Sequence, residues 1–239
     1  MRIDKMLANL GYGSRKEVKK LLKDGIIEVN EQKVKDPKQH VNPEKDIVTI
    51  NGERVEYKEF IYLMLNKPQG VISATEDSEH ETVLDLLDVD DLIFSPFPVG
   101  RLDKDTEGLL LLTNDGQLAH RLLAPKKHVP KTYFAVINSE VTEEDVVAFK
   151  KGVILDDGYE TKPGDLKIIK SGMTSDIELT ITEGKFHQVK RMFEAVGKRV
   201  MYLQRISMGP LMLDESLELG EYRELTDEEV TELLEYEVK

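Results

Sequence analysis

The side chains best placed to do chemistry lie in one segment, VGRLDKDTEGLLLLTNDG, at residues 99–116. Asp103 follows Gly100, Arg101 and Leu102 in a loop between two apolar segments, so the edge of a rigid sheet could present it beside the arginine. A carboxylate in such a place can act as a general base or as a nucleophile. A loop aspartate is more often a turn former or a helix cap, so this position by itself is only a candidate.

Two further acids, Asp105 and Glu107, stand close to Asp103 and open a second interpretation. Glycoside hydrolases use two carboxylates about 5 to 10 Å apart. The chain has no tryptophan to stack on a sugar. Asp105, like Asp115 in its Asn-Asp-Gly setting, is explained as a turn residue. A glycoside hydrolase would release free base or sugar from a simple glycoside.

The composition excludes several other kinds of chemistry. The chain has no cysteine, so disulfides, thiolate metal ligands and cysteine nucleophiles are excluded. The five histidines show no spacing typical of metal ligands, and we expect no metal. There is no apolar run of membrane-spanning length and no apolar stretch suited to a signal peptide at the start. We therefore expect a soluble, cytoplasmic protein with no membrane contact.

The formal net charge of −13 argues against a nucleic-acid partner until its distribution is considered. Residues 1–58 carry thirteen Lys or Arg against ten Asp or Glu, whereas the segment from Asp214 to the end carries eleven acids and two bases. Residues 1–23, 120–135 and 184–205 are each basic. An acidic tail can coexist with a basic working face, so the sequence still allows binding to phosphates.

The first part of the chain has the pattern of two short helices followed by small strands. Apolar residues from Ile3 to Leu10 recur at helical spacing. Ser14 and Glu17 form a capping-box pattern before a second helix, and Gly25 stands where that helix would end. Short strand-like runs, IIEVN, QKV and DIVTI, follow. We expect this first domain to span residues 1–58.

A helix hairpin with a small strand cover resembles the S4 RNA-binding domain, and the residues that carry the resemblance are RIDKMLANLGYGSRKEVKKLLKDGIIEVNEQKV. A lysine-rich helical face is often merely solvated. Here the bases cluster beside a tight helix-helix turn, without alternating acids, which favours a surface for RNA phosphates. The bases expected on that face are Arg15, Lys16, Lys19, Lys20 and Lys23.

Residues 59–239 interleave strands and helices without a regular βαβ repeat. We expect strands at FIYLML, VISAT, GLLLLT, KTYFAVI and DIELTI, and helices at 82–87, 117–124, 142–151, 186–197 and 227–237. This pattern predicts an α+β domain with a mainly antiparallel or mixed sheet flanked by helices.

GRLDKDTEGLLLLTNDG resembles the signature of pseudouridine synthases of the RsuA and RluB branch. YLMLNKPQGVIS resembles the first motif of this family, KTYFAV its tyrosine motif and EGKFHQVKRMF its third motif. Together with the S4-like start, the matching segments cover nearly the whole chain in the family's order. The segments MRIDK and GYGSRKEVK look more like the small-subunit ribosomal RNA enzymes of the branch than like its large-subunit enzymes.

The resemblance implies roles for individual side chains. Asp103 would be the catalytic carboxylate, and Tyr133 the ring that stacks on the target uracil. Lys190 would be the basic partner of Asp103, at a position where other branches carry arginine. Arg101 would help to hold the target nucleotide out of its helix. Further RNA contacts would come from Lys185, Gln188 and Arg191.

Each of these positions also has an ordinary structural interpretation. Tyr133, in a strand, could be core or interface packing. Lys190 and Arg191 could form a solvated helix face, and Arg101 could contact only phosphate. The family roles therefore rest on the joint pattern of motifs.

The implied reaction is the isomerisation of uridine to pseudouridine. The bond from uracil N1 to ribose C1′ breaks, the base turns, and C5 rejoins C1′, with no net redox change and no cofactor. Asp103 would attack C1′ or take the C2′ proton, and the sequence leaves both routes open. Either route needs an ionised carboxylate in a partly dry pocket, which requires a nearby cation such as Lys190. Extruding the base costs a few kcal/mol, and stacking on Tyr133 would return about 1 to 3 kcal/mol.

The implied substrate is structured ribosomal RNA rather than DNA, read where loops and bulges leave bases unpaired. We expect a monomeric enzyme that acts on 16S rRNA in a pre-ribosomal small-subunit intermediate. Two alternatives stay open. The same activity could act on large-subunit rRNA, or the chain could be a non-catalytic rRNA-binding or ribosome-assembly protein that kept the fold and lost the chemistry.

Overall fold

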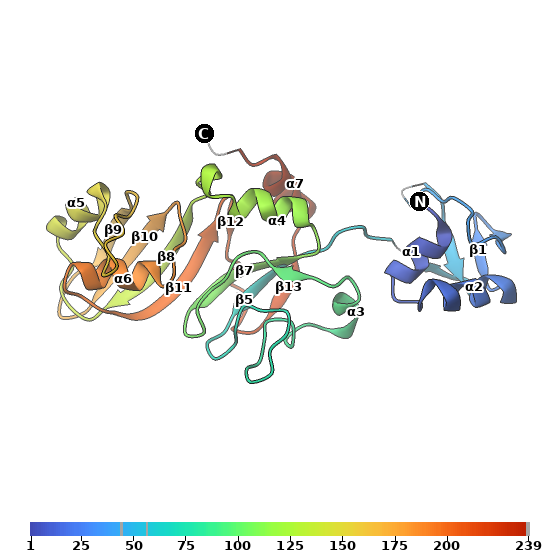
Figure 1. Cartoon of the computed structure of the whole chain (residues 1–239), viewed down its shortest axis with the longest axis horizontal. Helices are drawn as coiled ribbons and strands as arrows, with labels where there is room; N and C mark the ends of the chain where they lie inside the picture. The colour runs from blue at the N-terminus through green and yellow to red at the C-terminus, as the bar shows by residue number, and fades with distance from the viewer. Residues whose placement is uncertain (44, 56, 238–239) are drawn as a thin grey trace. The chain divides into compact units, whose positions relative to one another are not determined.

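The computed structural model describes residues 1–43, 45–55 and 57–237 (Figure 1). The chain divides into two compact units. Unit 1 comprises Met1–Ile61 with Asp88–Ser95, and unit 2 comprises Tyr62–Leu87 with Pro96–Lys239. The domain boundary predicted between residues 58 and 59 stays a prediction, since unit 1 also takes in a second segment.

Unit 1 is a helix pair packed on a small antiparallel sheet with the strand order β2-β1-β3-β4. Its α2 begins at the capping box, in which the Ser14 amide donates to the Glu17 carboxylate at 2.8 Å, and ends at Gly25 with φ +70°. The core between helices and sheet includes Ile3, Leu7 and Leu22. The elements are α1 (Ile3–Asn9), α2 (Arg15–Asp24), β1 (Ile27–Val29), β2 (Gln32–Lys33), β3 (Val48–Ile50), β4 (Glu53–Val55) and α3 (Val89–Leu92).

Unit 2 is built on one sheet with the order β13-β5-β7-β11-β8-β10-β9, to which β12 and β6 add at β11 and β7. β7 and β11 run parallel and the other neighbours antiparallel, so the predicted α+β class with a mixed sheet is confirmed. The strands are β5 (Tyr62–Lys67), β6 (Phe97–Pro98), β7 (Glu107–Thr113), β8 (Lys131–Ile137), β9 (Asp165–Lys170), β10 (Ser175–Ile181), β11 (Val200–Met208), β12 (Leu211–Met212) and β13 (Tyr222–Glu224).

Helices cover two parts of this sheet. They are α4 (Gly116–Leu123), the 3-10 turn η1 (Pro125–Lys127), α5 (Glu143–Lys151), α6 (Gln188–Ala195) and α7 (Asp227–Glu235). Figure 1 shows α5 beside β9 and α6 over the β8 and β11 part, and Phe149 of α5 meets Phe193 of α6 edge to face at 4.9 Å. Leu118 of α4 and Leu233 of α7 share an apolar cluster with Leu111 of β7. No helix within the described residues is both long and apolar enough to cross a membrane.

The parallel junction between β7 and β11 brings two backbones unusually close. Gly108 has φ +102°, and a Cβ there would lie against the carbonyl oxygen of Arg205, so only glycine fits. The Arg205 side chain is 2% exposed, and its Nε donates to the Leu109 carbonyl at 2.8 Å. This junction fixes the loop that precedes β7 against β11.

Two predicted elements are wrong. The VISAT segment forms no strand beyond an isolated bridge from Ile72 to Thr82, because Ser73 bonds instead to the backbone of Leu102. Residues 82–87 form turns rather than a helix. The Asp85 carboxylate accepts a hydrogen bond from the Thr82 amide at 2.7 Å. The backbone forms turns closed by hydrogen bonds between residues three apart, and it does not continue as a helix.

Two long strands were not predicted from the sequence. β9 has charged residues on its exposed side. In β11, Arg205 interrupts an alternation of apolar and polar residues. From the sequence, this segment was recognised only as basic. Arg205 is nevertheless buried in the sheet, because its nitrogen finds a backbone carbonyl on the neighbouring strand.

Gly108→Ala is expected to destabilise the protein by about 2 kcal/mol or more, because the methyl group collides with backbone that cannot move independently of β11. Gly116→Ala is the matched control, since nothing lies within 4 Å of a Cβ at the start of α4. That change should be neutral or stabilise by about 0.4 to 1 kcal/mol. Urea unfolding followed by circular dichroism measures both, and equal stability of the two variants would contradict the close-approach argument.

Candidate active site

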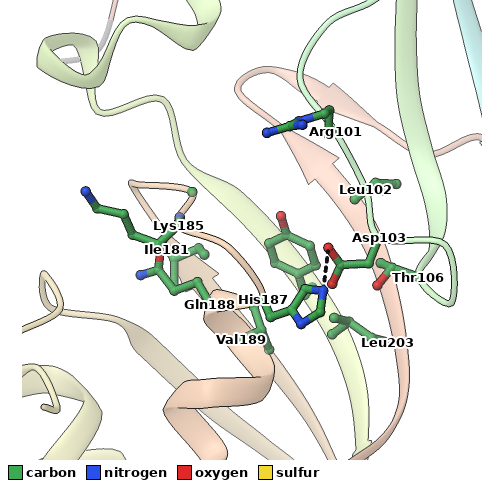
Figure 2. A pocket seen from close by; sticks show the side chains of 12 residues that line it. Arg101, Leu102, Asp103, Thr106, Ile181, Lys185, His187, Gln188, Val189 and Leu203 are labelled. Carbon is green, nitrogen blue, oxygen red and sulfur yellow. Dashed lines mark hydrogen bonds and ion pairs between the residues drawn. The ribbon is translucent and has the colours of Figure 1, made fainter. Parts of the chain in front are cut away.

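A cavity of about 80 Å³ lies in unit 2 between the loop that carries Asp103 and the start of α6 (Figure 2). Its walls come from β8, β10 and β11 through Tyr133, Ile181 and Leu203, and from His187 just before α6. A wider groove of about 690 Å³ shares Asp103 and His187 with this cavity. Segments far apart in the sequence thus meet at one carboxylate.

The Asp103 carboxylate has cationic and aromatic neighbours. Its Oδ2 accepts a hydrogen bond from Lys190 Nζ at 3.1 Å, and its Oδ1 lies 3.7 Å from His187 Nε2. The Asp103 side chain is 28% exposed and that of Lys190 20%, so both are shielded from water, and Asp103 lines the cavity. Figure 2 shows the His187 ring directed at Asp103. The carboxylate thus has a cation in contact with it.

Lys190 serves two carboxylates, since it also donates to Asp105 Oδ1 at 2.6 Å. Burial alone would lower the pKa of the Lys190 ammonium, but the hydrogen bonds to Asp105 and Asp103 outweigh it and raise that pKa above its ordinary value. The hydrogen bond from Lys190 lowers the pKa of the Asp105 carboxyl. Lys190 and Asp105 therefore stay charged across the neutral range.

A second ammonium group, that of Lys67 at the end of β5, lies fully buried under the same loop. It donates to the carbonyls of Pro68 at 2.8 Å and Thr106 at 3.0 Å. Burial lowers the pKa of Lys67 to about 8, although the charge of Asp103 acts in the opposite direction. Lys67 therefore ties the loop to β5 and adds a positive charge behind the carboxylates.

The loop that presents Asp103 is held by backbone on both sides. Ser73 Oγ accepts from the Leu102 amide and donates to the Leu102 carbonyl, each at 3.0 Å. The Gly70 amide donates to the Lys104 carbonyl at 2.8 Å, and the Thr106 amide to the Asp103 carbonyl at 3.0 Å. The position of the carboxylate is thus set by the fold rather than by side-chain contacts alone.

The floor of the cavity is apolar and aromatic. Tyr133 is 8% exposed and pairs across the strands with Leu179 of β10 and Arg205 of β11. Thr106 lines the same cavity, and its hydroxyl oxygen is buried with no hydrogen-bond partner. An unmatched buried hydroxyl is costly.

The structure brings some of the residues expected at the site together and places others apart. Asp103 and Tyr133 line the cavity, with Arg101 exposed at its rim, and Lys190 is joined to them through its hydrogen bond to Asp103. Arg191 is turned to Asp156 and Asp157, at 2.5 and 2.7 Å, and does not line either space.

The remaining positions expected to bind RNA differ in their surroundings. Gln188 is buried and donates to Glu183 at 2.6 Å, so it braces the loop before α6. Lys185 is exposed, with Nζ 4.4 Å from the centre of the Tyr159 ring. All five bases predicted on α2 are exposed in unit 1, namely Arg15, Lys16, Lys19, Lys20 and Lys23.

Sequence reasoning did not single out Lys67, His187 or Leu203. Lys67 carried a usable signal, since a lysine followed by proline ends an apolar strand in LMLNKPQG. His187 stands within the third motif, two residues before Val189 of the cavity wall. No feature of the sequence marked Leu203 as a cavity residue, because its strand, β11, was not predicted. Among the described residues, no group of three or more His, Asp or Glu is arranged to hold a metal ion.

Comparison with known proteins gives consistent results for both parts of the chain. Residues 61–195 match the model of the RNA pseudouridylate synthase family, and residues 1–48 match the S4 domain. The uncharacterized RNA pseudouridine synthase YtzG of Bacillus subtilis strain 168 is 60% identical over 232 residues, which covers 96% of this chain and 97% of that protein.

Two further relatives extend over the full length. The ribosomal small subunit pseudouridine synthase A of Escherichia coli K12 is 38% identical over 98% of this chain and 100% of its own. A crystal structure of a pseudouridylate synthase has a TM-score of 0.68 and 38% identity, covering 98% of this chain and 99% of that one.

The lowered pKa of Lys67 predicts a pH dependence of folding stability. The folded protein releases this proton near pH 8, whereas an ordinary lysine holds it to about pH 10.5, so between these values the unfolded chain binds more protons. Stability should therefore rise with pH through this window. Lys67→Met removes the effect. From pH 7.5 to 9.5, the unfolding free energy of the wild type should rise by about 1 to 2 kcal/mol relative to the variant. A pH-independent difference in urea unfolding would contradict the burial of a titrating ammonium.

Proposed function

This chain belongs to the RNA pseudouridylate synthase family, and on that basis we propose that it converts one uridine of 16S small-subunit ribosomal RNA to pseudouridine, with Asp103 as the reacting carboxylate. The observation that carries the proposal is that Asp103 and Tyr133 line one cavity while Lys190 donates a hydrogen bond to the Asp103 carboxylate. These three side chains supply a carboxylate, its cation and an aromatic surface.

The geometry suits a reaction at the ribose of an everted uridine. Tyr133 provides a buried ring against which a uracil can stack, which offsets part of the cost of removing it from an RNA helix. Leu203 and Ile181 supply apolar surface around that ring and keep water away.

Asp103 would open the glycosidic bond from its position at the cavity wall. It either bonds to C1′ as N1 leaves, or takes the C2′ proton as N1 leaves and a glycal forms. The detached uracil turns in the cavity, and C5 bonds to C1′ as the bond from C1′ to Asp103 breaks or, on the glycal route, as the proton returns to C2′. C5 then loses its proton and N1 gains one, so the product is an isomer of the substrate. Lys190 donates a hydrogen bond to the carboxylate before the first step and stays charged itself, as the raised pKa of its ammonium indicates.

The choice of small-subunit RNA rests on the relatives. Several proteins 38 to 39% identical to this chain over nearly its whole length are named ribosomal small subunit pseudouridine synthase A. The S4 domain adds an exposed row of bases on α2 that suits the phosphates of a neighbouring stem. We propose that this row sets the position of the protein on the RNA while the cavity takes the uridine, and that the substrate is an incompletely assembled small subunit bound by a monomer.

Asp103→Asn should abolish pseudouridine formation, because the amide can neither attack C1′ nor accept a proton. The measurement is carbodiimide-blocked primer extension on ribosomal RNA from a deletion strain complemented with the variant. Asp105→Asn is the matched control: it removes the other carboxylate on Lys190 and should keep the rate within about tenfold of wild type, since general acid-base contributions are larger. Full modification by the Asp103 variant, or its loss only in the Asp105 variant, would end the assignment.

Removing two bases from α2 should weaken RNA binding more at low salt than at high salt. For Lys16→Gln with Lys20→Gln, the slope of log affinity against log salt should fall by about 2, because each phosphate contact contributes about 0.9. Lys150→Gln with Lys151→Gln removes the same charge from exposed residues of α5 and should change the slope little. The two slopes are measured by filter binding of a 16S transcript at about 50 to 300 mM salt, the range in which phosphate contacts are progressively screened. Equal slopes for the two double variants would refute the role of α2.

A further inference from the structure

Two stacked rings, those of Phe186 and His187, line the groove that Asp103 also lines, directly before α6 begins at Gln188. The Phe186 ring lies face to face with the His187 imidazole, with centroids 3.7 Å apart and planes 19° from parallel. Phe186 is 75% exposed, more than any other phenylalanine or tyrosine among the described residues. Exposed apolar rings are unfavourable unless something covers them, so this ring needs an explanation beyond folding.

Hydrogen bonds around Phe186 fix the backbone that carries its ring. The Lys185 amide donates to Gln188 Oε1 at 2.8 Å, and the buried Gln188 amide group donates to Glu183 at 2.6 Å. Arg191 reaches back to the Phe186 carbonyl at 3.4 Å. The ring therefore presents one face that is already ordered, which reduces the entropy lost when a flat molecule stacks on it.

The surroundings favour a nucleic acid as the molecule that covers this face. Phe186 lines the groove of about 690 Å³ together with Arg101, Lys104 and Lys185, whose charges suit a phosphate backbone. His187, on which it stacks, lies 3.7 Å from Asp103. The His187 ring thus lies between the Phe186 ring and the Asp103 carboxylate.

We propose that Phe186 is a stacking platform for the unpaired nucleobase directly next to the target uridine, and that His187 backs this ring. The inference rests on the proposed function, because it needs an RNA strand whose uridine enters the cavity at Asp103. Phe186 offers a flat surface with no hydrogen-bonding group, so it holds the flanking base whatever its identity. Tyr133 takes the target base and Phe186 takes its neighbour, and the strand is thereby opened at two successive nucleotides.

The absence of tryptophan from the chain makes a direct test available. Phe186→Trp places a single indole on the platform, where stacking of a nucleobase quenches its fluorescence. The probe is an unmodified 16S rRNA transcript, titrated into a Phe186→Trp, Asp103→Asn protein so that no turnover occurs. We expect emission to fall by about twofold or more and to saturate together with binding measured by filter retention. Met173→Trp in the same background is the control, because Met173 is 94% exposed and lines neither space at the site. Its emission should stay nearly constant.

A second variant tests the energetic contribution of the ring. Phe186→Ala should weaken binding of the same transcript by about 5- to 100-fold, the range expected for one stacked base, and Phe186→Tyr should restore it. Because the side chain is exposed, neither change should affect folding. Unchanged Phe186→Trp emission with RNA bound, or wild-type affinity of the Phe186→Ala protein, would overturn the platform.

The outcomes for the platform and for the proposed function are separable. Pseudouridine formation in the transcript is measured with wild-type protein and does not depend on any change at residue 186. Active wild-type protein with an unresponsive Phe186→Trp signal overturns the platform alone. Quenching of the Phe186→Trp signal by a transcript that the wild-type protein does not modify supports stacking of a base at Phe186 and overturns modification of free 16S rRNA by this protein.

Discussion

One ammonium group shared between two carboxylates sets the geometry of the candidate active site. Lys190 donates to both Asp103 and Asp105, and so joins α6 to a loop 87 residues earlier in the chain. Because an isolated charge in a partly dry cavity is unfavourable, neither the loop nor the helix could hold its charged residue there without the other. With Lys67 buried behind the same loop, two cations face two carboxylates, and the site can be shielded from water without an unpaired charge.

The rest of unit 2 serves to keep this arrangement from moving. The Asp103 loop is bonded through Ser73 and Gly70 to the segment after β5, and the Lys67 ammonium fixes the Thr106 carbonyl. The close approach of Gly108 to the Arg205 backbone places β7 against β11, which brings Leu203 next to the loop. A reacting carboxylate must be positioned to a fraction of an ångström, and backbone hydrogen bonds achieve this better than flexible side chains.

Charge in this protein is distributed by function rather than by composition. A net charge of −13 coexists with an exposed row of bases on α2 and with lysines around the groove. Not every base in a basic segment is available, however. Arg191 lies in such a segment and is paired with Asp156 and Asp157, so the count of Lys and Arg between 184 and 205 overstates the charge offered to RNA.

Much of the architecture followed from local patterns. Capping at Ser14, the glycine at 25, the continuous apolar run of β7 and the alternation in β8 and β10 each reflect short-range physics, and the elements they predict are present. The segments that failed were those in which a distant partner decides the conformation. Residues 71–75 form no strand because Ser73 bonds to the backbone of Leu102. β11 was not predicted because it contains Arg205, a charged residue that is buried there with its hydrogen bond to the Leu109 carbonyl.

The sequence by itself determined the family motifs, the mixed class of the sheet and the types of side chain needed for the chemistry. It could not determine which of these side chains meet, because motif residues can come together or, like Arg191, turn to other partners. Only the tertiary structure decided that Lys190 bridges two carboxylates, that Lys67 lies buried beneath them and that Phe186 stands uncovered on His187. These outcomes depend on desolvation and on contacts between segments far apart in the chain, which no local pattern of residues specifies.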